Sequence, residues 1–320
     1  MKTTAIVGIS KNAGKTSYLN WYIKNQKQST TFAVTTTGHD GEDIDLITGD
    51  KKPKVLLPAN TLFTSSANIY DTQSSQIEVV EKLPFRVIGK PLWLYKTIGA
   101  IEAEVIGAAT RKEQESLIEI FKKHDTQHIL IDGSLDRKSI CLSDKITEIA
   151  LVIGASAGNL NEITKKAQIL KLYSDIPLNR ETMHTSQCIT YFQKDKITQT
   201  DIASIYSNET KIIEILSQKP RWIYFPAAIT DKSYSKLKYT LLNTTSDIVF
   251  HHPLNINLPA TDINDLINTN KLFTNTRFPL KTIAVNSHAT NNEHIDVELL
   301  KYEIKKIFID LPVIDITEIY

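Results

Sequence analysis

The most constraining feature of the sequence is a glycine-rich segment, residues 8–16, which lies between a short apolar run and a helical pattern. The apolar run at residues 4–7 has the length and composition of a buried strand. Leu19, Tyr22 and Ile23 recur at helical spacing, so we expect a helix after the glycines. A strand, a glycine-rich turn and a helix are the first half of a unit in which helices join parallel strands. This order predicts an α/β fold.

The rest of the chain continues the alternation of strands and helices. Apolar and β-branched runs predict strands at residues 31–37, 128–131, 149–153, 222–225, 248–251, 282–286 and 313–316. Helical periodicity predicts helices at residues 111–123, about 161–172, 231–242, 261–268 and 296–308. Short runs punctuated by proline and glycine predict an antiparallel insertion at about 51–107, with strands at 54–57, 62–65, 76–81, 92–96 and 102–106.

The length and this pattern predict two domains. The chain has 320 residues, which is the length of about two ordinary domains. We expect a P-loop NTPase domain at residues 1–180, with a mainly parallel sheet and the antiparallel β insertion. A smaller α/β domain is expected at residues 181–320, and the sequence places the boundary no more closely than 178–220.

The composition narrows the classes of function. The sequence holds 37 basic and 36 acidic residues, and the basic ones are spread along the chain, which argues against nucleic-acid and membrane-surface partners. The 2 cysteines are too few for a disulfide framework. Lys11 comes too early for a signal peptide, and no apolar stretch approaches the roughly 20 residues of a membrane-spanning helix. We expect a soluble, cytoplasmic protein.

The glycine-rich segment has the residue types that a phosphate-binding loop needs. The residues expected to contact a nucleotide there are Gly8, Ser10, Lys11, Asn12, Ala13, Gly14, Lys15 and Thr16. Glycines let the backbone curl so that successive N–H groups point toward phosphate oxygens, and the helix that follows directs its positive dipole end at the same anion. Lys15 would add a charge at the β- and γ-phosphates, and the Thr16 hydroxyl would bind Mg²⁺. The alternative is a helix start without a ligand.

A second magnesium-binding group is expected at the end of the strand at residues 128–131. Asp132 follows this strand and would lie at the carboxyl edge of a parallel sheet, beside the glycine-rich segment. Its carboxylate would hold Mg²⁺ directly or through water, and would serve catalysis together with Lys15. The alternative is an ordinary turn formed by Asp132 and Gly133.

An acidic loop, residues 40–45, follows the strand at residues 31–37. It contains Asp40, Glu42, Asp43 and Asp45, and carboxylates at this density repel one another unless water or a cation neutralises them. Because the loop also opens on the carboxyl edge of the sheet, we expect Asp40 to orient the attacking water or to hold Mg²⁺ through water. The alternative is a solvated acidic turn.

The spacing of the glycines differs from the common phosphate-binding loop. Five residues separate Gly8 from Gly14, where the common pattern has four. In this spacing the segment resembles the loops of dethiobiotin synthetase and the cobyric acid synthases. The Asn-Lys-x-Asp motif that reads the base in P-loop GTPases is missing, which favours ATP as the nucleotide. Neither cysteine lies in a Gly-x-Cys-x-Gly elbow, so the glutamine amidotransferase half of cobyric acid synthases is not expected.

Several segments together resemble the ATPase or reactivase components associated with the cobalamin-dependent lysine and ornithine aminomutases. The matching residues are 7–16, 40–42, 57–62, 131–139, 154–156, 224–230 and 312–315. The chain departs from this family at Asn286-Ser287-His288, where Asn-Pro is expected, and at Pro226-Ala227, where Pro-Gly is expected. The resemblance implies an ATP-driven protein that releases damaged cobalamin from a partner. That partner would be an aminomutase or a companion reactivase subunit, and a homodimer stays open.

Two other classes of function fit the same residues. One is an ATP-dependent ligase resembling dethiobiotin synthetase, and the other is a nucleotide-sensing module without catalysis. The three differ in what stimulates ATP turnover: a protein for the remodelling ATPase, a small acid or amine for the ligase, and nothing for the sensor. Remodelling further requires that the ATP and ADP states bind the partner with different affinities.

Overall fold

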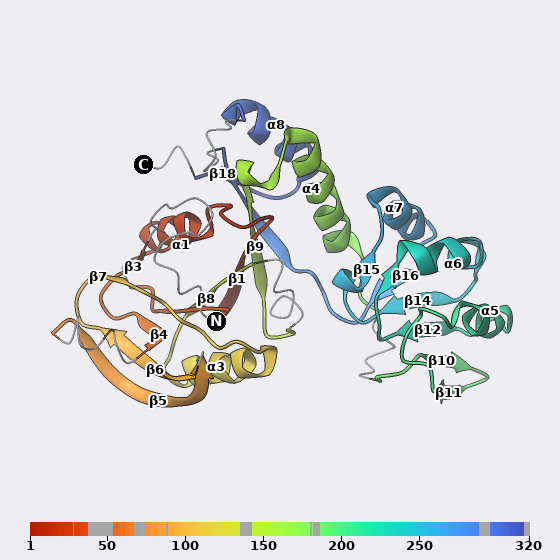
Figure 1. The fold of residues 1–320 in the computed structure, drawn as a ribbon, viewed down its shortest axis with the longest axis horizontal. Helices are drawn as coiled ribbons and strands as arrows, with labels where there is room; N and C mark the ends of the chain where they lie inside the picture. The colour runs from red at the N-terminus through yellow and green to blue at the C-terminus, as the bar shows by residue number, and fades with distance from the viewer. Residues whose placement is uncertain are drawn as a thin grey trace. The chain divides into compact units, whose positions relative to one another are not determined.

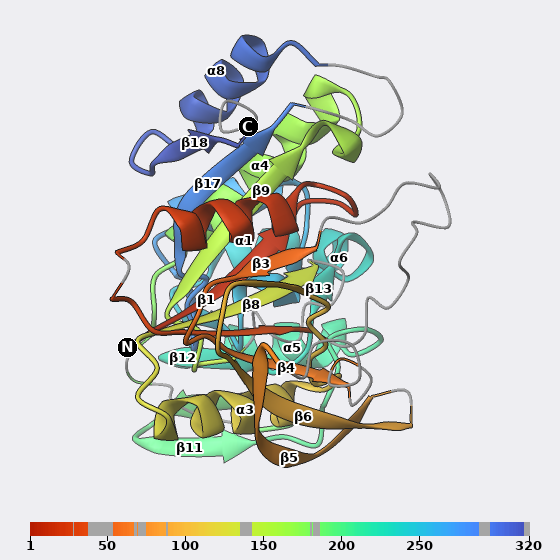
Figure 2. The same ribbon diagram turned by 90° about the vertical axis from the view of Figure 1, so that its left-hand side faces the viewer.

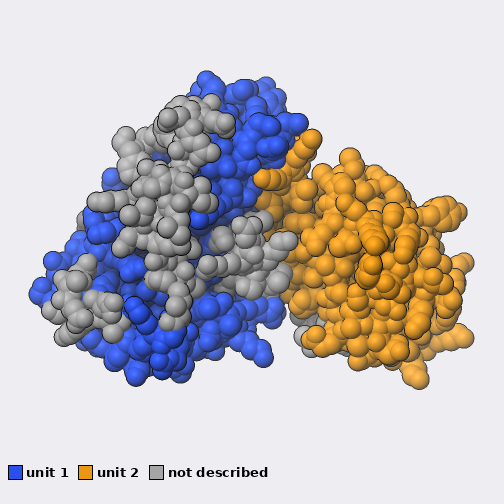
Figure 3. All heavy atoms as spheres, in the orientation of Figure 1, with its two compact units in different colours: residues 1–164, 279–320 blue, residues 165–278 orange. Residues whose placement is uncertain are grey.

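The computed structural model describes residues 1–27, 29–37, 54–66, 69, 75–87, 89–134, 143–179, 181, 186–287 and 295–316. Contacts divide the chain into two compact units (Figure 3). One unit is formed by Met1–Thr164 together with Pro279–Tyr320, and the other by Lys165–Phe278. The expected α/β class is confirmed, because helices alternate with the strands of a large sheet that contains parallel and antiparallel pairs.

A nine-stranded sheet is the framework of the first unit (Figures 1 and 2). Its strands, in spatial order, are β18 (Val313–Asp315), β17 (Leu280–Asn286), β9 (Glu148–Gly154), β1 (Lys2–Gly8), β8 (His128–Ser134), β2 (Phe32–Thr36), β4 (Leu62–Ser66), β6 (Lys90–Thr97) and β5 (Ile77–Val87). Neighbours from β18 to β4 pair in parallel, whereas β6 pairs antiparallel with both β4 and β5. The central strands are buried on both faces, which explains their continuous apolar runs.

The expected antiparallel insertion needs a correction. Its strands exist, but β4 pairs in parallel with β2 and is therefore part of the main sheet, which β6 and β5 then extend with antiparallel pairs. Two further strands, β3 (Val55–Leu57) and β7 (Ile101–Ala103), pair antiparallel with each other in a separate ribbon. All five residues of β4 are buried, as is typical of an inner strand, so its neighbours and not its own pattern decide its direction.

The connections between strands reverse their direction across the sheet at β1. From β1 the chain passes through helix α1 (Lys15–Lys24) to β2 on one side, and from β8 it later crosses to β9 on the other side. Such a reversal leaves a crevice at the carboxyl ends of the neighbouring strands, where ligands of open α/β sheets bind. Gly8 is the last residue of β1, so the glycine-rich segment begins at this crevice.

Helices cover both faces of this sheet. Helix α1 packs against β1 and β8, and it contributes Tyr18, Leu19 and Ile23 to the core. Figures 1 and 2 show α3 (Arg111–Lys123) on the other side of the sheet. Helix α8 (Val297–Ile307) lies against β17 and β18. Among the described residues, no helix combines the length and the apolar composition that crossing a membrane requires.

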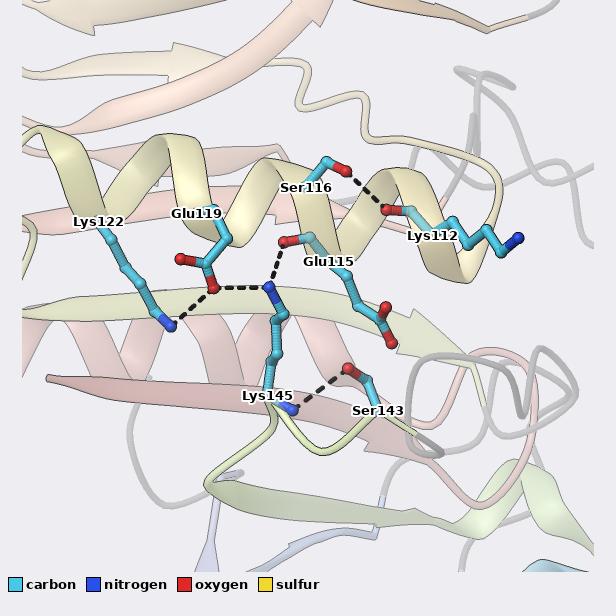
Figure 4. A network of polar contacts seen from close by, with 7 residues as sticks. All are labelled: Lys112, Glu115, Ser116, Glu119, Lys122, Ser143 and Lys145. Atoms are coloured by element: carbon cyan, nitrogen blue, oxygen red, sulfur yellow. Dashed lines mark hydrogen bonds and ion pairs between the residues drawn. The ribbon is translucent and has the colours of Figure 1, made fainter. Parts of the chain in front are cut away.

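Charged side chains tie α3 to the segment before β9 (Figure 4). Lys145 Nζ donates to Glu119 Oε1 at 2.6 Å and to the Glu115 carbonyl oxygen at 3.4 Å, and Lys122 Nζ donates to the same Glu119 oxygen at 2.9 Å. The hydrogen bonds from Lys145 and Lys122 lower the pKa of Glu119 to about 2. Because these side chains are 33% to 46% exposed, water screens their charges and the contacts add little to the stability of the fold.

Within the described residues, the second unit contains a five-stranded sheet, three whole α-helices and, from Lys165 on, the rest of a fourth. In spatial order its strands are β11 (Lys196–Gln199), β10 (Thr190–Gln193), β12 (Trp222–Phe225), β14 (Asp247–Phe250) and β16 (Leu272–Thr274). The whole helices are α5 (Glu209–Ser217), α6 (Asp231–Asn243) and α7 (Ala260–Asn268), and a short pair joins β13 (Ile229–Thr230) to β15 (Ile256–Asn257). β12, β14 and β16 pair in parallel, as expected for an α/β unit.

The expected division at residues 180 and 181 also needs a correction. The first unit gives way to the second at Thr164, inside helix α4 (Leu160–Asp175), and the chain returns to the first unit at Pro279. After this return, β17 pairs with β9, and β18 pairs with β17. A strand–helix–strand pattern looks the same in either unit, so the sequence could not show which sheet these strands join.

Candidate functional site

The glycine-rich segment forms a tight loop between β1 and α1. Asn12 and Gly14 adopt positive φ angles of 59° and 97°. The left-handed conformation of Gly14 ends the loop immediately before Lys15, where α1 begins. A Cβ atom on Gly8 would lie 2.9 Å from the Ser10 carbonyl oxygen, because the loop folds back over this residue. Glycine is therefore required at both positions, at Gly8 for space and at Gly14 for its backbone conformation.

Lys15 follows the inner side of this loop. Its Cδ atom lies 3.2 Å from the position that a Cβ atom would take on Gly8, and the residue is half-buried. The aliphatic stem of Lys15 therefore runs back toward the end of β1. The Lys15 side chain therefore lies close to the loop that would bind a phosphate.

The first turn of α1 carries no negative charge of its own. Gly14 provides no side-chain cap, and the turn contains no acidic residue. Each of the other α-helices in the described ranges has an acidic residue in its first turn, namely Glu113, Glu162, Glu209, Asp231, Asp262 and Glu298. No side chain of that turn neutralises the N–H groups and the positive dipole end of α1, which is the electrostatic condition for binding an external anion.

Thr16 and Asp132 meet at the start of α1. Thr16 Oγ1 donates a hydrogen bond to Asp132 Oδ2 at 3.2 Å. Asp132 lies in β8, where it pairs in register with Ile6 of β1 and Thr36 of β2. The neighbouring strand thus delivers a carboxylate to the first turn of the helix, as the position of Asp132 in the sequence predicted. A hydroxyl and a carboxylate beside an anion site are oxygen ligands of the kind that Mg²⁺ prefers.

The loop after β9 supports the glycine-rich segment from one side. Ser10 Oγ and Ser156 Oγ lie 3.1 Å apart, and Ser156 Oγ donates to the Lys11 carbonyl oxygen at 3.1 Å. A Cβ atom on Gly154 would lie 2.6 Å from Ala13 Cα, so the missing side chain lets the end of β9 approach the loop. Ser156 is not among the residues expected from the sequence to contact a nucleotide, although it lies only three residues after the predicted strand at residues 149–153.

Asn286, the last residue of β17, supports the loop from a second direction. Its Nδ2 atom donates to the Ala13 carbonyl oxygen at 3.3 Å. The same atom lies 2.6 Å from the position that a Cβ atom would take on Gly14. Sequence reasoning missed Asn286 as a site residue, although the signal that selected Asp132, a polar residue at the end of a predicted strand, also marks Asn286.

An aromatic cluster holds α1 on the sheet. Tyr22 Oη and His128 Nδ1 lie 3.2 Å apart, and the Tyr18 ring lies 6.1 Å from the Tyr22 ring. Burial is the main reason why the pKa of Tyr18 and of Tyr22 is raised. Burial, followed by the charge of Lys2, lowers the pKa of His128. These neutral, packed groups fix the position of the helix whose first turn borders the glycine-rich segment.

The residues present fit a nucleotide bound together with magnesium. The loop supplies space and backbone donors, Lys15 a cation, Thr16 a hydroxyl and Asp132 a carboxylate. Among the described residues, no group of three or more His, Cys, Asp or Glu side chains could hold a metal ion. Of the described residues, Thr16 and Asp132 would offer a magnesium ion a hydroxyl and a carboxylate, and Mg²⁺ commonly takes its other ligands from phosphate oxygens and water. Asp40 and the acidic loop at 40–45 lie outside the described residues.

No protein-family model, no curated protein and no solved structure matches this chain.

Proposed function

We propose that the chain binds magnesium-bound ATP at the glycine-rich segment and hydrolyses it. The hydrogen bond of 3.2 Å between Thr16 and Asp132, at the start of a helix without an acidic first turn, is the observation that supports this most directly. A hydroxyl backed by a carboxylate is what the protein contributes to magnesium in many phosphoryl-transfer sites. ATP is favoured over GTP because the Asn-Lys-x-Asp motif is missing from the sequence.

Each part of the site has its own task in this proposal. Backbone N–H groups of the loop and of the first turn of α1 bind the phosphate oxygens. Lys15 reduces the negative charge on the β- and γ-phosphates, and Thr16 with Asp132 would hold the magnesium ion. When bound, magnesium supplies the positive charge that stabilises the transferring phosphoryl group. Asp40 would orient the attacking water, because in the sequence it follows the strand at residues 31–37, at the carboxyl edge of the sheet.

Calorimetric titration with ATP, in the presence and absence of Mg²⁺, tests this site. Thr16→Ala removes the hydroxyl, and we expect the affinity for Mg·ATP to fall about tenfold, which corresponds to about 1.4 kcal/mol. The affinity for ATP without Mg²⁺ should change little, because the hydroxyl is proposed to act through the ion.

Two further variants control this experiment. Thr16→Ser keeps the hydroxyl and should bind Mg·ATP like the wild type. Ser17→Ala removes a hydroxyl from the next residue of the same turn, which is also half-buried, and it should have no effect. Unchanged affinity in Thr16→Ala, or an equal loss in Ser17→Ala, would show that Thr16 has no special role.

Remodelling of a partner enzyme is the proposed use of the ATP. The support is the sequence resemblance to ATPase components of cobalamin-dependent aminomutases, together with a second compact unit, Lys165–Phe278, that is distinct from the sheet carrying the loop. Nucleotide-dependent affinity for the partner would supply the driving force, because a ligand shifts an equilibrium only by its differential affinity.

ATP turnover measured with three kinds of additive separates this proposal from its alternatives. An aminomutase that carries inactivated cobalamin should raise turnover if the chain remodels that enzyme. Strong stimulation by a small acid or amine would instead indicate a ligase, as in dethiobiotin synthetase. Tight ATP binding with almost no turnover under every condition would indicate a nucleotide sensor.

A further inference from the structure

A pocket of about 460 Å³ opens between the second half of α1 and the β3–β7 ribbon. Its wall on the helix side includes Trp21 and Ile23, and its wall on the ribbon side includes Leu56, Leu57 and Ile101. No residue of the glycine-rich segment lines it, so the pocket is separate from the proposed nucleotide site. Its volume is in the range of ligand sites for small molecules, which is about 300–1,000 Å³.

The pocket is held open by a side chain that spans its two walls. Asn20 Nδ2 donates to the Lys54 carbonyl oxygen at 3.0 Å, and Asn20 Oδ1 accepts from the Leu56 N–H at 2.9 Å. These two hydrogen bonds fasten the ribbon to α1 and use both functional atoms of the amide. The two hydrogen bonds fix the shape of the pocket. The walls beside them are apolar and can contact an apolar ligand.

Leu56 and Trp21 are two large apolar residues in the lining of the pocket. Leu56 is 50% exposed, whereas its neighbours in the strand, Val55 and Leu57, are buried, as expected from the alternation of side chains along a strand. Trp21 is partly buried and packs against the core cluster, so its indole ring is held in place at the wall. An exposed leucine and a packed aromatic ring in the same lining favour a flat, apolar ligand, since rings pack well against such surfaces.

The charge at the rim selects the polar end of the ligand. Lys24 lines the pocket and, within the part of the chain that the structure describes, no hydrogen bond or ion pair to its ammonium group is found. Glu102 also lines the pocket, and it is not without a partner. Of the two charged residues that line the pocket, Lys24 is thus the one for which no partner is found among the described residues.

We propose that this pocket is a second binding site, which takes a small molecule with a flat apolar body and a single carboxylate. The apolar body would lie between Trp21 and Leu56, and the carboxylate would face Lys24. Burial of apolar surface would supply most of the affinity, and the exposed ion pair would supply a modest preference for anions.

Calorimetric titration with three naphthalene derivatives tests the proposal. The probes are 2-naphthoate, the neutral 2-naphthalenemethanol and the cationic 2-naphthylmethylamine. We expect the naphthoate to bind saturably with one molecule per chain, and about twofold to fivefold more tightly than the amine. Lys24→Glu alters an exposed side chain and should reverse this order without affecting the fold.

A matched pair of leucine variants locates the binding. Leu56→Asp should weaken naphthoate binding by about fivefold or more, because it places a charge on the apolar wall. Leu299→Asp is the control, since Leu299 lies on α8 and is 45% exposed, close to the value for Leu56. The proposal is overturned if no probe binds saturably, if Lys24→Glu leaves the order unchanged, or if Leu299→Asp loses as much binding as Leu56→Asp.

Discussion

Thr16 and Asp132 are 116 residues apart in the chain, yet their side-chain oxygens lie 3.2 Å from each other. The order of strands explains this approach. β8 inserts between β1 and β2, so the end of β8 lies directly beside the point where β1 leads into the loop and α1. The hydrogen bond therefore joins the first turn of α1 to β8, and it forms only because β8 lies next to β1 in the sheet.

Asp132→Asn should impair ATP hydrolysis while leaving the fold intact. Asparagine keeps the size of the side chain and an acceptor for the Thr16 hydroxyl, but it removes the negative charge that would stabilise a magnesium ion. We predict a loss of hydrolysis of about 10-fold to 100-fold, as is typical of groups that support a metal ligand, and a higher Mg²⁺ concentration at half-maximal rate. Steady-state kinetics at varied Mg²⁺, with a thermal unfolding curve as control, measures both. An unchanged rate and Mg²⁺ dependence would mean that Asp132 is a residue of β8 without a role in hydrolysis.

Gly14→Ala should destabilise the first unit more than Gly89→Ala. Both glycines have positive φ angles, 97° and 73°, where alanine costs roughly 1–2 kcal/mol. A Cβ atom on Gly14 would in addition meet Asn286 Nδ2 at 2.6 Å, whereas the space around Gly89 is open. Urea denaturation measures the difference, and a second change, Asn286→Ala, should reduce it. An equal loss in the free energy of unfolding for the two variants would mean that a Cβ atom on Gly14 does not clash with Asn286.

The stability of the first unit should decrease when His128 becomes protonated. Burial and the charge of Lys2 lower the pKa of His128 from its ordinary 6.5, so the unfolded chain binds a proton at a pH where the folded protein does not. The stabilising contribution is complete above about pH 6.5 and is lost as the pH falls through the lowered pKa. Urea denaturation at several values from about pH 7 to about pH 5 should therefore show a steeper loss for the wild type than for His128→Gln. Parallel curves for the two proteins would refute this role of His128.

The acidic loop at 40–45 should respond to the bound nucleotide. Its clustered carboxylates repel one another, and a nearby cation would relieve that repulsion, so we expect Mg·ATP to protect residues 38–46 from hydrogen exchange more than ADP does. Asp40→Asn should lower hydrolysis more than ATP binding. Identical exchange without nucleotide, with a non-hydrolysed ATP analogue and with ADP would leave the loop as a solvated turn.

Local patterns were enough to identify most strands and helices. The predicted helix at 111–123 and the predicted strand at 222–225 coincide with α3 and β12. The periodicity was sufficient to predict α3, and in the structure a complete capping box between Thr110 and Glu113 fixes where this helix begins. Strands β10 and β11 were not predicted, because most of their side chains are exposed or half-buried and the apolar signal is weak.

The pairing of distant strands could not be predicted from the sequence. β4 pairs in parallel with β2, and β17 pairs with β9 of the first sheet. Both pairings depend on which neighbours bury each strand, and local periodicity carries no information about those neighbours. The same limit applies to the site. Lys15 and Thr16 could be selected from the glycine-rich motif, and Asp132 from its place at a predicted strand. Asn286 contacts the loop only because β17 pairs with β9.

The affinity of Lys15→Ala for Mg·ATP, measured by calorimetry, tests the central claim most directly. The loop geometry places Lys15 against Gly8, where it would contact the phosphates, and a charge-assisted contact is worth roughly 1.5–3 kcal/mol. We predict that the wild type binds one ATP per chain and that Lys15→Ala binds at least about tenfold more weakly. Lys24→Ala, which removes a lysine from the far end of the same helix, should bind ATP like the wild type. Equal ATP affinity in the wild type and Lys15→Ala, or no ATP binding by the wild type, would contradict a nucleotide site at the glycine-rich segment.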